Sequence, residues 1–238
     1  DLFPGVTALD VVNGSRKTVS LAARPNLAAV VYLRVSPDQR TWFITGADVN
    51  SKHNDQVATT WAIDAGSRLI RWSAHGPAGA YASPVQVSPD GRRLAVGYST
   101  GAADVLDAAN GRLVVRDASS SPVASGDLAL APGDAELVTA SLDGLLTIWT
   151  ALGSEQLRLQ APADPAIGFT PDGTGLALVG NHGEIVDRRT GRTVRRFPGF
   201  PAGLVVNYCN SGFAASPGLG GVTHLDPRAE TQIGRDHV

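Results

Sequence analysis

The sequence predicts an all-β protein, a β-propeller built from four-stranded antiparallel blades. Short apolar runs separated by turn signals recur along the chain. The turn prolines Pro37, Pro89, Pro132 and Pro171 are spaced 52, 43 and 39 residues apart, close to the ~40–45 residues of a four-stranded blade. The 27 glycines and 15 prolines are spread along the 238 residues, and they interrupt every stretch that has a helical apolar period. Helices are therefore expected to be minor.

The clearest repeat runs from Val85 to Val115 and contains four apolar runs. Its first two runs are separated by Ser88-Pro89-Asp90-Gly91, where proline fixes φ, aspartate bonds the backbone ahead of it and glycine accepts a positive φ. Its last two runs are separated by Asn110-Gly111, the strongest short signal for a hairpin. This repeat is predicted to form a four-stranded meander.

The same order of runs and turns divides the rest of the chain. Residues 1–24 supply only an outer hairpin around Asn13-Gly14, and five full blades are expected at about 29–75, 80–118, 123–160, 163–199 and 202–238. The first blade carries extra length, which is predicted as a polar loop from Asp48 to Gln56. We expect one domain overall, with residues 25–238 forming the blades and residues 1–24 part of a closing blade. The complete ring is expected to have six to eight blades, its missing inner strands coming from outside this chain segment or from a partner chain.

Each predicted strand is an apolar or alternating run bounded by turn residues. The runs are, in chain order, Ala8–Val12, Lys17–Leu21, Val30–Val35, Trp42–Thr45, Ala58–Ile63, Leu69–Trp72, Val85–Val87, Leu94–Tyr98, Val105–Asp107, Leu113–Val115, Asp127–Leu130, Leu137–Ala140, Leu146–Trp149, Gln156–Leu159, Ala166–Phe169, Leu176–Val179, Glu184–Asp187, Thr193–Phe197, Leu204–Tyr208, Phe213–Ala215, Val222–Asp226 and Thr231–Gly234.

Composition excludes several classes of partner. With 20 Lys and Arg against 22 Asp and Glu, the net charge of −2 makes nucleic acid an unfavoured partner for this domain. No apolar run approaches the ~18 residues of a spanning helix, so membrane insertion is not expected. Cys209 is the only cysteine, which rules out an internal disulfide and a thiolate metal cluster. A cytoplasmic location fits this, and an extracellular domain without disulfides fits it too. Arginine almost replaces lysine, which indicates a GC-rich bacterial genome.

Leu137 to Trp149, reading LVTASLDGLLTIW, resembles the core of a WD-repeat (WD40-type) blade. The resemblance implies that Thr139, Asp143 and Trp149 belong to a hydrogen-bonded network that locks one blade to its neighbour. Two departures stand out, because Thr150 replaces the aspartate that follows the Trp in that family, and no Gly-His dipeptide precedes any unit. The Ser/Thr-Pro-Asp-Gly turns at Ser88 and Thr170 are typical of degenerate bacterial members.

A second family competes with the first. Ala62-Ile63-Asp64, Ser67 and Trp72 resemble the A-x-D-x-x-T-G-x-x-x-W repeat of pyrroloquinoline-quinone-type propellers. In both families such residues are structural, and both resemblances imply a propeller. The docking residues and carboxylate set that a quinone cofactor needs are not recognisable in this sequence, so we expect no cofactor.

Residues with catalytic or metal-binding chemistry do not form a recognisable set. None of the five histidines has metal-ligand spacing, so no metal site is expected. No nucleophile elbow is present, and no catalytic residue is predicted. Gly218, Gly220 and Gly221 lack the Lys-Ser/Thr of a phosphate loop. The one dense basic cluster, Arg188 to Arg196, fits a solvated rim hairpin, and a docking patch for an acidic partner or nucleic acid is the alternative.

These observations favour a non-enzymatic propeller that acts as a protein-interaction, scaffold or sensor module of a larger bacterial regulatory or signalling protein. Its partner is expected to be another protein or another domain of the same polypeptide. The expected binding face carries the turns between second and third strands, with the residues Asp48, Ser99, Thr100, Leu142, Asp143, Asn181, His182 and Leu219. The alternative is a propeller enzyme, a hydrolase, lactonase or quinoprotein, with its site at the central channel.

Overall fold

The computed structural model describes residues 6–9, 16–19, 27–50, 55–117, 125–131, 133, 136–150, 154–161, 166–170, 172–179, 183–197, 204–209, 212–217, 222–225 and 235–236. The structure describes side chains only between residues 32 and 196, with internal gaps. Every regular element in these ranges is a strand. No helix in them is long and apolar enough to span a bilayer.

The strands form one two-stranded sheet and five four-stranded sheets. The two-stranded sheet pairs β1 (Val6–Leu9) with β2 (Arg16–Val19). Sheet 1 contains β3 (Leu27–Val35), β4 (Thr41–Asn50), β5 (Asp55–Asp64) and β6 (Ile70–His75). Sheet 2 contains β7 (Ala82–Val87), β8 (Arg93–Tyr98), β9 (Ala103–Asp107) and β10 (Leu113–Asp117).

Sheet 3 contains β11 (Ser125–Leu130), β12 (Glu136–Ser141), β13 (Leu145–Thr150) and β14 (Glu155–Gln160). Sheet 4 contains β15 (Ala166–Phe169), β16 (Gly175–Val179), β17 (Gly183–Asp187) and β18 (Thr193–Phe197). Sheet 5 contains β19 (Leu204–Cys209), β20 (Gly212–Pro217), β21 (Val222–Leu225) and β22 (Arg235–Asp236). In every sheet the strands follow chain order and pair antiparallel, so each sheet is a meander.

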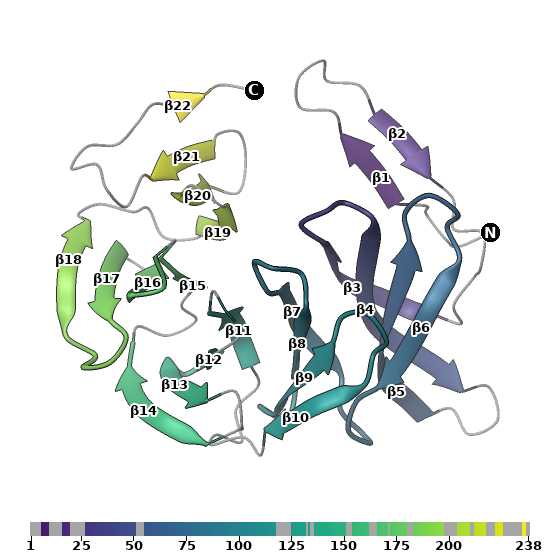
Figure 1. Cartoon of the computed structure of the whole chain (residues 1–238), viewed down its shortest axis with the longest axis horizontal. Helices are drawn as coiled ribbons and strands as arrows, with labels where there is room; N and C mark the ends of the chain where they lie inside the picture. The colour runs from purple at the N-terminus through teal and green to yellow at the C-terminus, as the bar shows by residue number, and fades with distance from the viewer. Residues whose placement is uncertain are drawn as a thin grey trace.

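The sheets are arranged in succession around a common centre (Figure 1). The first strands of neighbouring sheets contact each other, β3 with β7, β7 with β11, β11 with β15 and β15 with β19. The fourth strands, β6, β10, β14 and β18, lie at the periphery (Figure 1). This is the radial arrangement of a propeller, and it confirms the predicted fold class. The number of blades in the ring, its closure and the division at residue 24 stay predictions.

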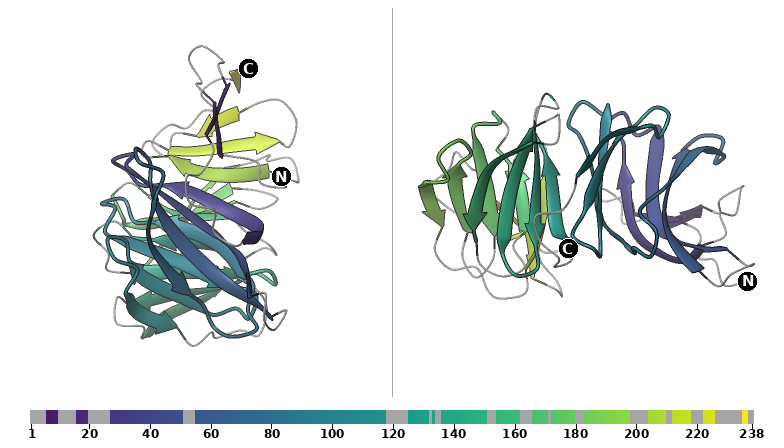
Figure 2. Two further views of the ribbon diagram at one scale, coloured as in Figure 1. Left: turned by 90° about the vertical axis from the view of Figure 1, so that its right-hand side faces the viewer. Right: turned by 90° about the horizontal axis from the view of Figure 1, so that it is seen from below.

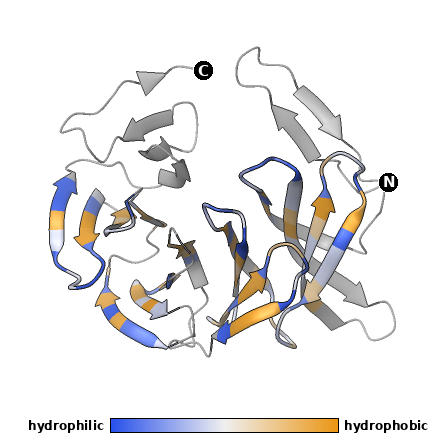
Figure 3. Cartoon of the chain, in the orientation of Figure 1, coloured by the Kyte–Doolittle hydropathy of each residue, from blue (hydrophilic) through white to orange (hydrophobic). Residues whose placement is uncertain are grey.

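Apolar clusters between consecutive sheets form the core. One joins sheets 1 and 2 and includes Phe43 and Val96, a second joins sheets 2 and 3 around Trp149, and a third joins sheets 3 and 4 around Phe169. Middle strands such as β8 and β12 are buried on both faces, whereas β6 and β14 alternate between half-buried and exposed positions. Figure 3 shows hydrophobic residues along the strands and hydrophilic ones at the turns. Since burial stabilises by roughly 25 cal/mol per Å2 of apolar surface, contact between sheets holds the fold together.

The predicted Ser/Thr-Pro-Asp turns form in sheets 1, 2 and 4. In sheet 2 the Ser88 hydroxyl donates to Asp90 Oδ1 at 2.6 Å and accepts the N–H of Arg93 at 2.9 Å, while Asp90 Oδ1 accepts the N–H of Arg92 at 3.0 Å. The same bonds recur at Ser36 and at Thr170. The turns therefore shape the sheet ends, as the sequence predicts.

Gln39 occupies the turn position that Gly91 and Gly173 fill elsewhere, and it has a φ of 60°. A left-handed conformation strains a residue with a Cβ. Gln39→Gly is therefore expected to raise the free energy of unfolding by up to about 1 kcal/mol, measured as a shift in the urea midpoint. The reciprocal Gly91→Ala, at a φ of 75°, should lower it, and a loss of stability in Gln39→Gly would contradict this account of the turn.

The predicted loop from Asp48 to Gln56 is wrong at both ends, where residues 48–50 and 55–56 belong to strands. β4 continues to Asn50 and β5 begins at Asp55, with Asn50 opposite Asp55 and Asp48 opposite Val57. The alternation of small or apolar with polar residues in this stretch allows the ladder to extend, so the polar composition does not mark a loop. The predicted last strand, Thr231–Gly234, lies outside the described residues, and β22 is Arg235–Asp236.

Candidate interaction face

An antiparallel meander places the turn between its second and third strands at one end of the sheet, together with the connections that lead to the next sheet. The right-hand view of Figure 2 shows the sheets with turns at two opposite ends. We call the end that carries the turns between second and third strands the tyrosine face. Its described residues include Tyr81, Ser99, Thr100, Leu142 and Asp143. Four of these five are residues that the sequence predicts for the binding face.

Tyr81 was not predicted from the sequence, and among the described residues of this face it has the largest exposed apolar side chain. It lies in the connection from β6 to β7, with 56% of its surface exposed. The turn after β8 fixes its position, because Tyr81 N–H donates to Ser99 Oγ at 2.9 Å and Ser99 N–H donates to Tyr81 O at 2.9 Å. The Ser99 hydroxyl is therefore engaged in positioning the backbone of Tyr81.

Leu142 and Asp143 occupy the turn between β12 and β13. Leu142 is 44% exposed. The Ser141 hydroxyl donates to the Asp143 carboxylate, which also accepts the N–H of Leu145 at 3.3 Å. These bonds lower the pKa of Asp143 from its ordinary value, the Ser141 bond being the larger cause. The turn thus holds its carboxylate and presents Leu142 to solvent.

The structure tests the other predicted face residues only in part. Asp48 pairs opposite Val57 within the β4–β5 ladder, not in a turn. Asn181, His182 and Leu219 lie outside the described residues. Thr100 is exposed at the turn after β8. The predicted face as a set stays a prediction.

Of the predicted blade network, the structure brings Thr139 and Trp149 together. Trp149 Nε1 donates to Thr139 Oγ1 at 2.9 Å, and both side chains are buried. The Asp143 carboxylate makes the bonds to Ser141 and Leu145 described above and belongs to the turn. The three-residue network stays a prediction.

A buried polar cluster lies beneath the tyrosine face in sheet 2, on strands β8, β9 and β10. Asp104, 1% exposed, accepts the Tyr98 hydroxyl at 3.1 Å and two guanidinium bonds from Arg116 at 3.1 and 3.2 Å. Burial, followed by the nearby Asp104 charge, raises the pKa of Tyr98. The Tyr98 ring packs against Gly76 in the β6–β7 connection, where an added Cβ would lie 2.3 Å from Tyr98 Cε1. This cluster therefore fixes the connection that carries Tyr81.

Within the described ranges no three His, Cys, Asp or Glu side chains lie close enough to hold a metal ion. His75 shares a 2.9 Å hydrogen bond with Thr59 Oγ1 on the neighbouring strand. The expectations of no metal, no cofactor and no catalytic residue stay predictions.

The turn carboxylates predict a dependence of stability on pH. The Ser36 hydroxyl, then the N–H of Arg40, lowers the pKa of Asp38, and Thr170, then the N–H of Thr174, lowers that of Asp172. The folded pKa thus lies below the unfolded value of about 3.9. The stabilisation is present above that value and is lost as pH falls through the folded pKa.

Urea midpoints measured from about pH 6 to pH 3 are expected to decline. Ser36→Ala should make the decline shallower, since it removes the main cause of the Asp38 shift. Ser99→Ala is the matched control, because that hydroxyl bonds a backbone N–H and no carboxylate. An identical decline in wild type and Ser36→Ala would contradict the assignment.

Comparison with known proteins identifies the fold. No family model matches the chain, and no curated protein matches it. Among solved structures, it is similar to a chain in the crystal structure of the mitotic checkpoint complex, with a TM-score of 0.67 and 17% identity over 93% of this chain and 71% of that one. At this identity the likeness shows the fold alone, which is that of a β-propeller.

Proposed function

We propose that this chain is a non-enzymatic protein-interaction module that binds its partner through the tyrosine face. The partner is another protein or another domain of the same polypeptide, within a larger bacterial regulatory or signalling protein of the cytoplasm. The near absence of lysine, with only Lys17 and Lys52, supports the bacterial origin, and the single cysteine fits a reducing compartment.

The observation that carries the proposal is the exposed aromatic side chain of Tyr81 on the tyrosine face. Tyrosine is enriched at protein interfaces, because it supplies a large contact area and a hydroxyl at low entropic cost. Hydrogen bonds hold Tyr81 and Leu142 in place. The backbone of Tyr81 pairs with that of Ser99, and Leu142 lies in the turn that the Ser141–Asp143 bond closes. When a partner buries both side chains, this chain therefore loses little conformational entropy.

A capture experiment with matched variants tests the proposal. Immobilised wild type, Tyr81→Ser/Leu142→Ser and the control Val114→Ser are exposed to soluble extract of the source cells, and captured proteins are quantified by mass spectrometry. Val114 is similarly exposed at 40% but lies on the outer strand β10. We expect a partner that wild type and the control retain and the double variant loses. Absence of such a partner, or equal loss in the control, would argue against the tyrosine face.

A further inference from the structure

The end of the sheets opposite the tyrosine face carries the turns between first and second strands and between third and fourth strands. We call it the arginine face; its described arginines are Arg40, Arg68, Arg71, Arg92, Arg93, Arg112, Arg188, Arg189 and Arg192. A backbone bond links the two turns in sheet 1, from Ala65 N–H to Arg40 O at 2.9 Å. Equivalent bonds occur in sheet 2, Ala108 to Arg92 at 2.9 Å, and in sheet 4, Arg188 to Thr174 at 3.3 Å.

These turns also contact those of the neighbouring sheet. A Cβ at Gly91 would lie 3.3 Å from Pro37 Cδ, which places the first turns of sheets 1 and 2 side by side. Between sheets 3 and 4, Arg188 Nη1 donates to Glu136 Oε2 at 2.9 Å. The arginine face is therefore a continuous surface within each of these pairs of sheets.

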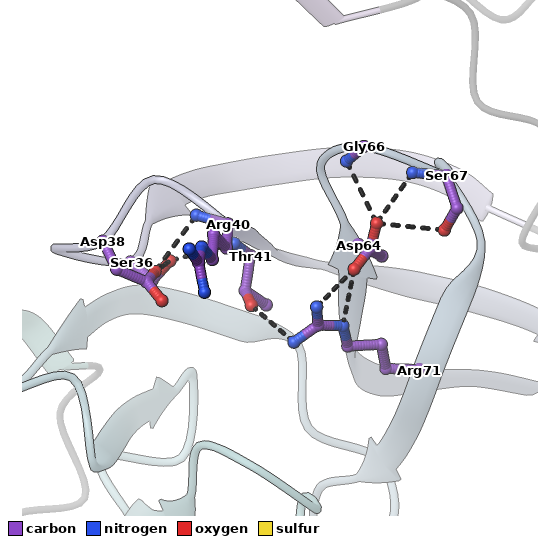
Figure 4. Close-up of polar contacts among 8 residues, drawn as sticks. All are labelled: Ser36, Asp38, Arg40, Thr41, Asp64, Gly66, Ser67 and Arg71. Carbon is purple, nitrogen blue, oxygen red and sulfur yellow. Dashed lines mark hydrogen bonds and ion pairs between the residues drawn. The ribbon is translucent and has the colours of Figure 1, made fainter.

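The carboxylates Asp38, Asp64 and Asp187 of this face bond within their own turns. Figure 4 shows these bonds in sheet 1. Asp64 accepts the N–H groups of Gly66 and Ser67 and pairs with Arg71. Asp38 accepts the Ser36 hydroxyl and the backbone N–H of Arg40. In sheet 4, Asp187 accepts the hydroxyl and N–H of Thr190 at 2.7 Å each. Their acceptor capacity is thus largely used inside the protein.

Several arginine side chains of this face are exposed to solvent. Arg40, Arg112, Arg189 and Arg192 are exposed, and within the described residues no carboxylate forms an ion pair with them. Arginine recurs at equivalent positions, since Arg112 and Arg192 each follow the glycine of a third-to-fourth-strand turn. The pattern is a set of separate cations distributed over several sheets.

Exposed aliphatic side chains accompany these arginines. Leu113 follows Arg112 directly, and Val194, 69% exposed, lies two residues after Arg192. Leu69 occupies the position of Arg112 and Arg192 in the turn of sheet 1, and it is exposed too. Arginines beside apolar contacts are typical of protein interfaces. Nucleic acid would require a continuous basic surface and gains nothing from these aliphatic groups.

We propose that the arginine face is a second binding surface, which takes an extended acidic peptide segment of a partner with apolar side chains between its carboxylates. The carboxylates pair with Arg40, Arg112, Arg189 and Arg192, and the apolar side chains cover Leu113 and Val194. This surface is separate from the tyrosine face, so the two engage different partner segments.

Fluorescence anisotropy with a labelled peptide that repeats Glu-Leu-Ser-Asp tests the proposal. Each of Arg40→Gln, Arg112→Gln and Arg192→Gln is expected to weaken binding by about two- to fivefold. Raising salt from about 50 to 300 mM should weaken it further. Arg158→Gln is the matched control, because Arg158 pairs with Glu155 on the outer strand β14, and it should bind as wild type does.

Further comparisons separate the possible occupants. Leu113→Ser/Val194→Ser should weaken binding of this peptide but leave unchanged the weaker binding of one that repeats Glu-Ser-Ser-Asp. Thermal melts of each variant confirm folding. No binding of the acidic peptide, equal loss in Arg158→Gln, or tighter binding of single-stranded DNA of equal charge would each overturn the proposal. Tyr81→Ser/Leu142→Ser is not expected to change binding of this peptide. Failure of the arginine-face proposal would therefore not count against the tyrosine face, which the capture experiment tests separately.

Discussion

Trp149→Ala is expected to lower the free energy of unfolding by about 3–5 kcal/mol. Trp149 is 6% exposed and packs with Leu128, Leu130 and Leu137 in the cluster between sheets 2 and 3. Its Nε1 donates to Thr139 Oγ1 at 2.9 Å. The substitution therefore removes the indole that fills the contact between sheets and leaves the Thr139 hydroxyl without this donor. Urea unfolding followed by circular dichroism measures the loss.

Trp149→Phe separates packing from hydrogen bonding. It keeps most of the aromatic volume and removes the Nε1 donor, so a smaller loss of about 1–3 kcal/mol is expected. Leu142→Ala, at the exposed turn, should change stability by less than about 0.5 kcal/mol. A loss in Trp149→Ala no larger than that of the surface control would show that contact between sheets 2 and 3 does not stabilise the fold.

Gly111→Ala is expected to lower the free energy of unfolding by about 2–4 kcal/mol, from two additive causes. Gly111 has a φ of 72°, where a Cβ is strained. The added Cβ would lie 2.5 Å from Trp72 Cε3, so the indole must move. That movement weakens the bond from Trp72 Nε1 to Ala108 O, 3.1 Å long, which joins sheets 1 and 2.

Gly79→Ala is the matched control for Gly111→Ala. Gly79 has a φ of 71°, and nothing lies within 4 Å of the position that an added Cβ would take there. This change should cost only the backbone strain, about 1 kcal/mol. The difference between the two variants, measured by urea midpoints, isolates the contact with Trp72. Equal losses would show that Trp72 adapts without cost.

The parts of the fold that depend on local turn chemistry were predictable from the sequence. Ser88-Pro89-Asp90-Gly91 and Asn110-Gly111 form turns because their side chains bond the backbone next to them and glycine takes the positive φ. Local chemistry fails where a neighbouring strand decides. The β4–β5 ladder continues through Asp48 although its composition is polar, since cross-strand pairing outweighs propensity there.

The candidate faces depend on contacts between distant residues. Tyr81 and Ser99 are joined across two strands, and no sequence pattern links them. The Tyr98–Asp104–Arg116 cluster likewise requires three strands in register. In contrast, the Thr139–Trp149 bond joins adjacent strands of one hairpin, which the repeat pattern already aligns. Sequence reasoning thus located the turns of the tyrosine face but missed the aromatic residue between sheets.

Site-specific photo-crosslinking in the source cells tests most directly whether this propeller binds a protein through the tyrosine face. A photoreactive amino acid replaces Leu142 in one variant and Val114 in the other, both exposed and on different surfaces of the molecule. The proposed function predicts one discrete crosslinked partner from position 142, lost when Tyr81→Ser is added, and none from position 114. No crosslinked protein from position 142, or the same partner from both positions, would contradict it.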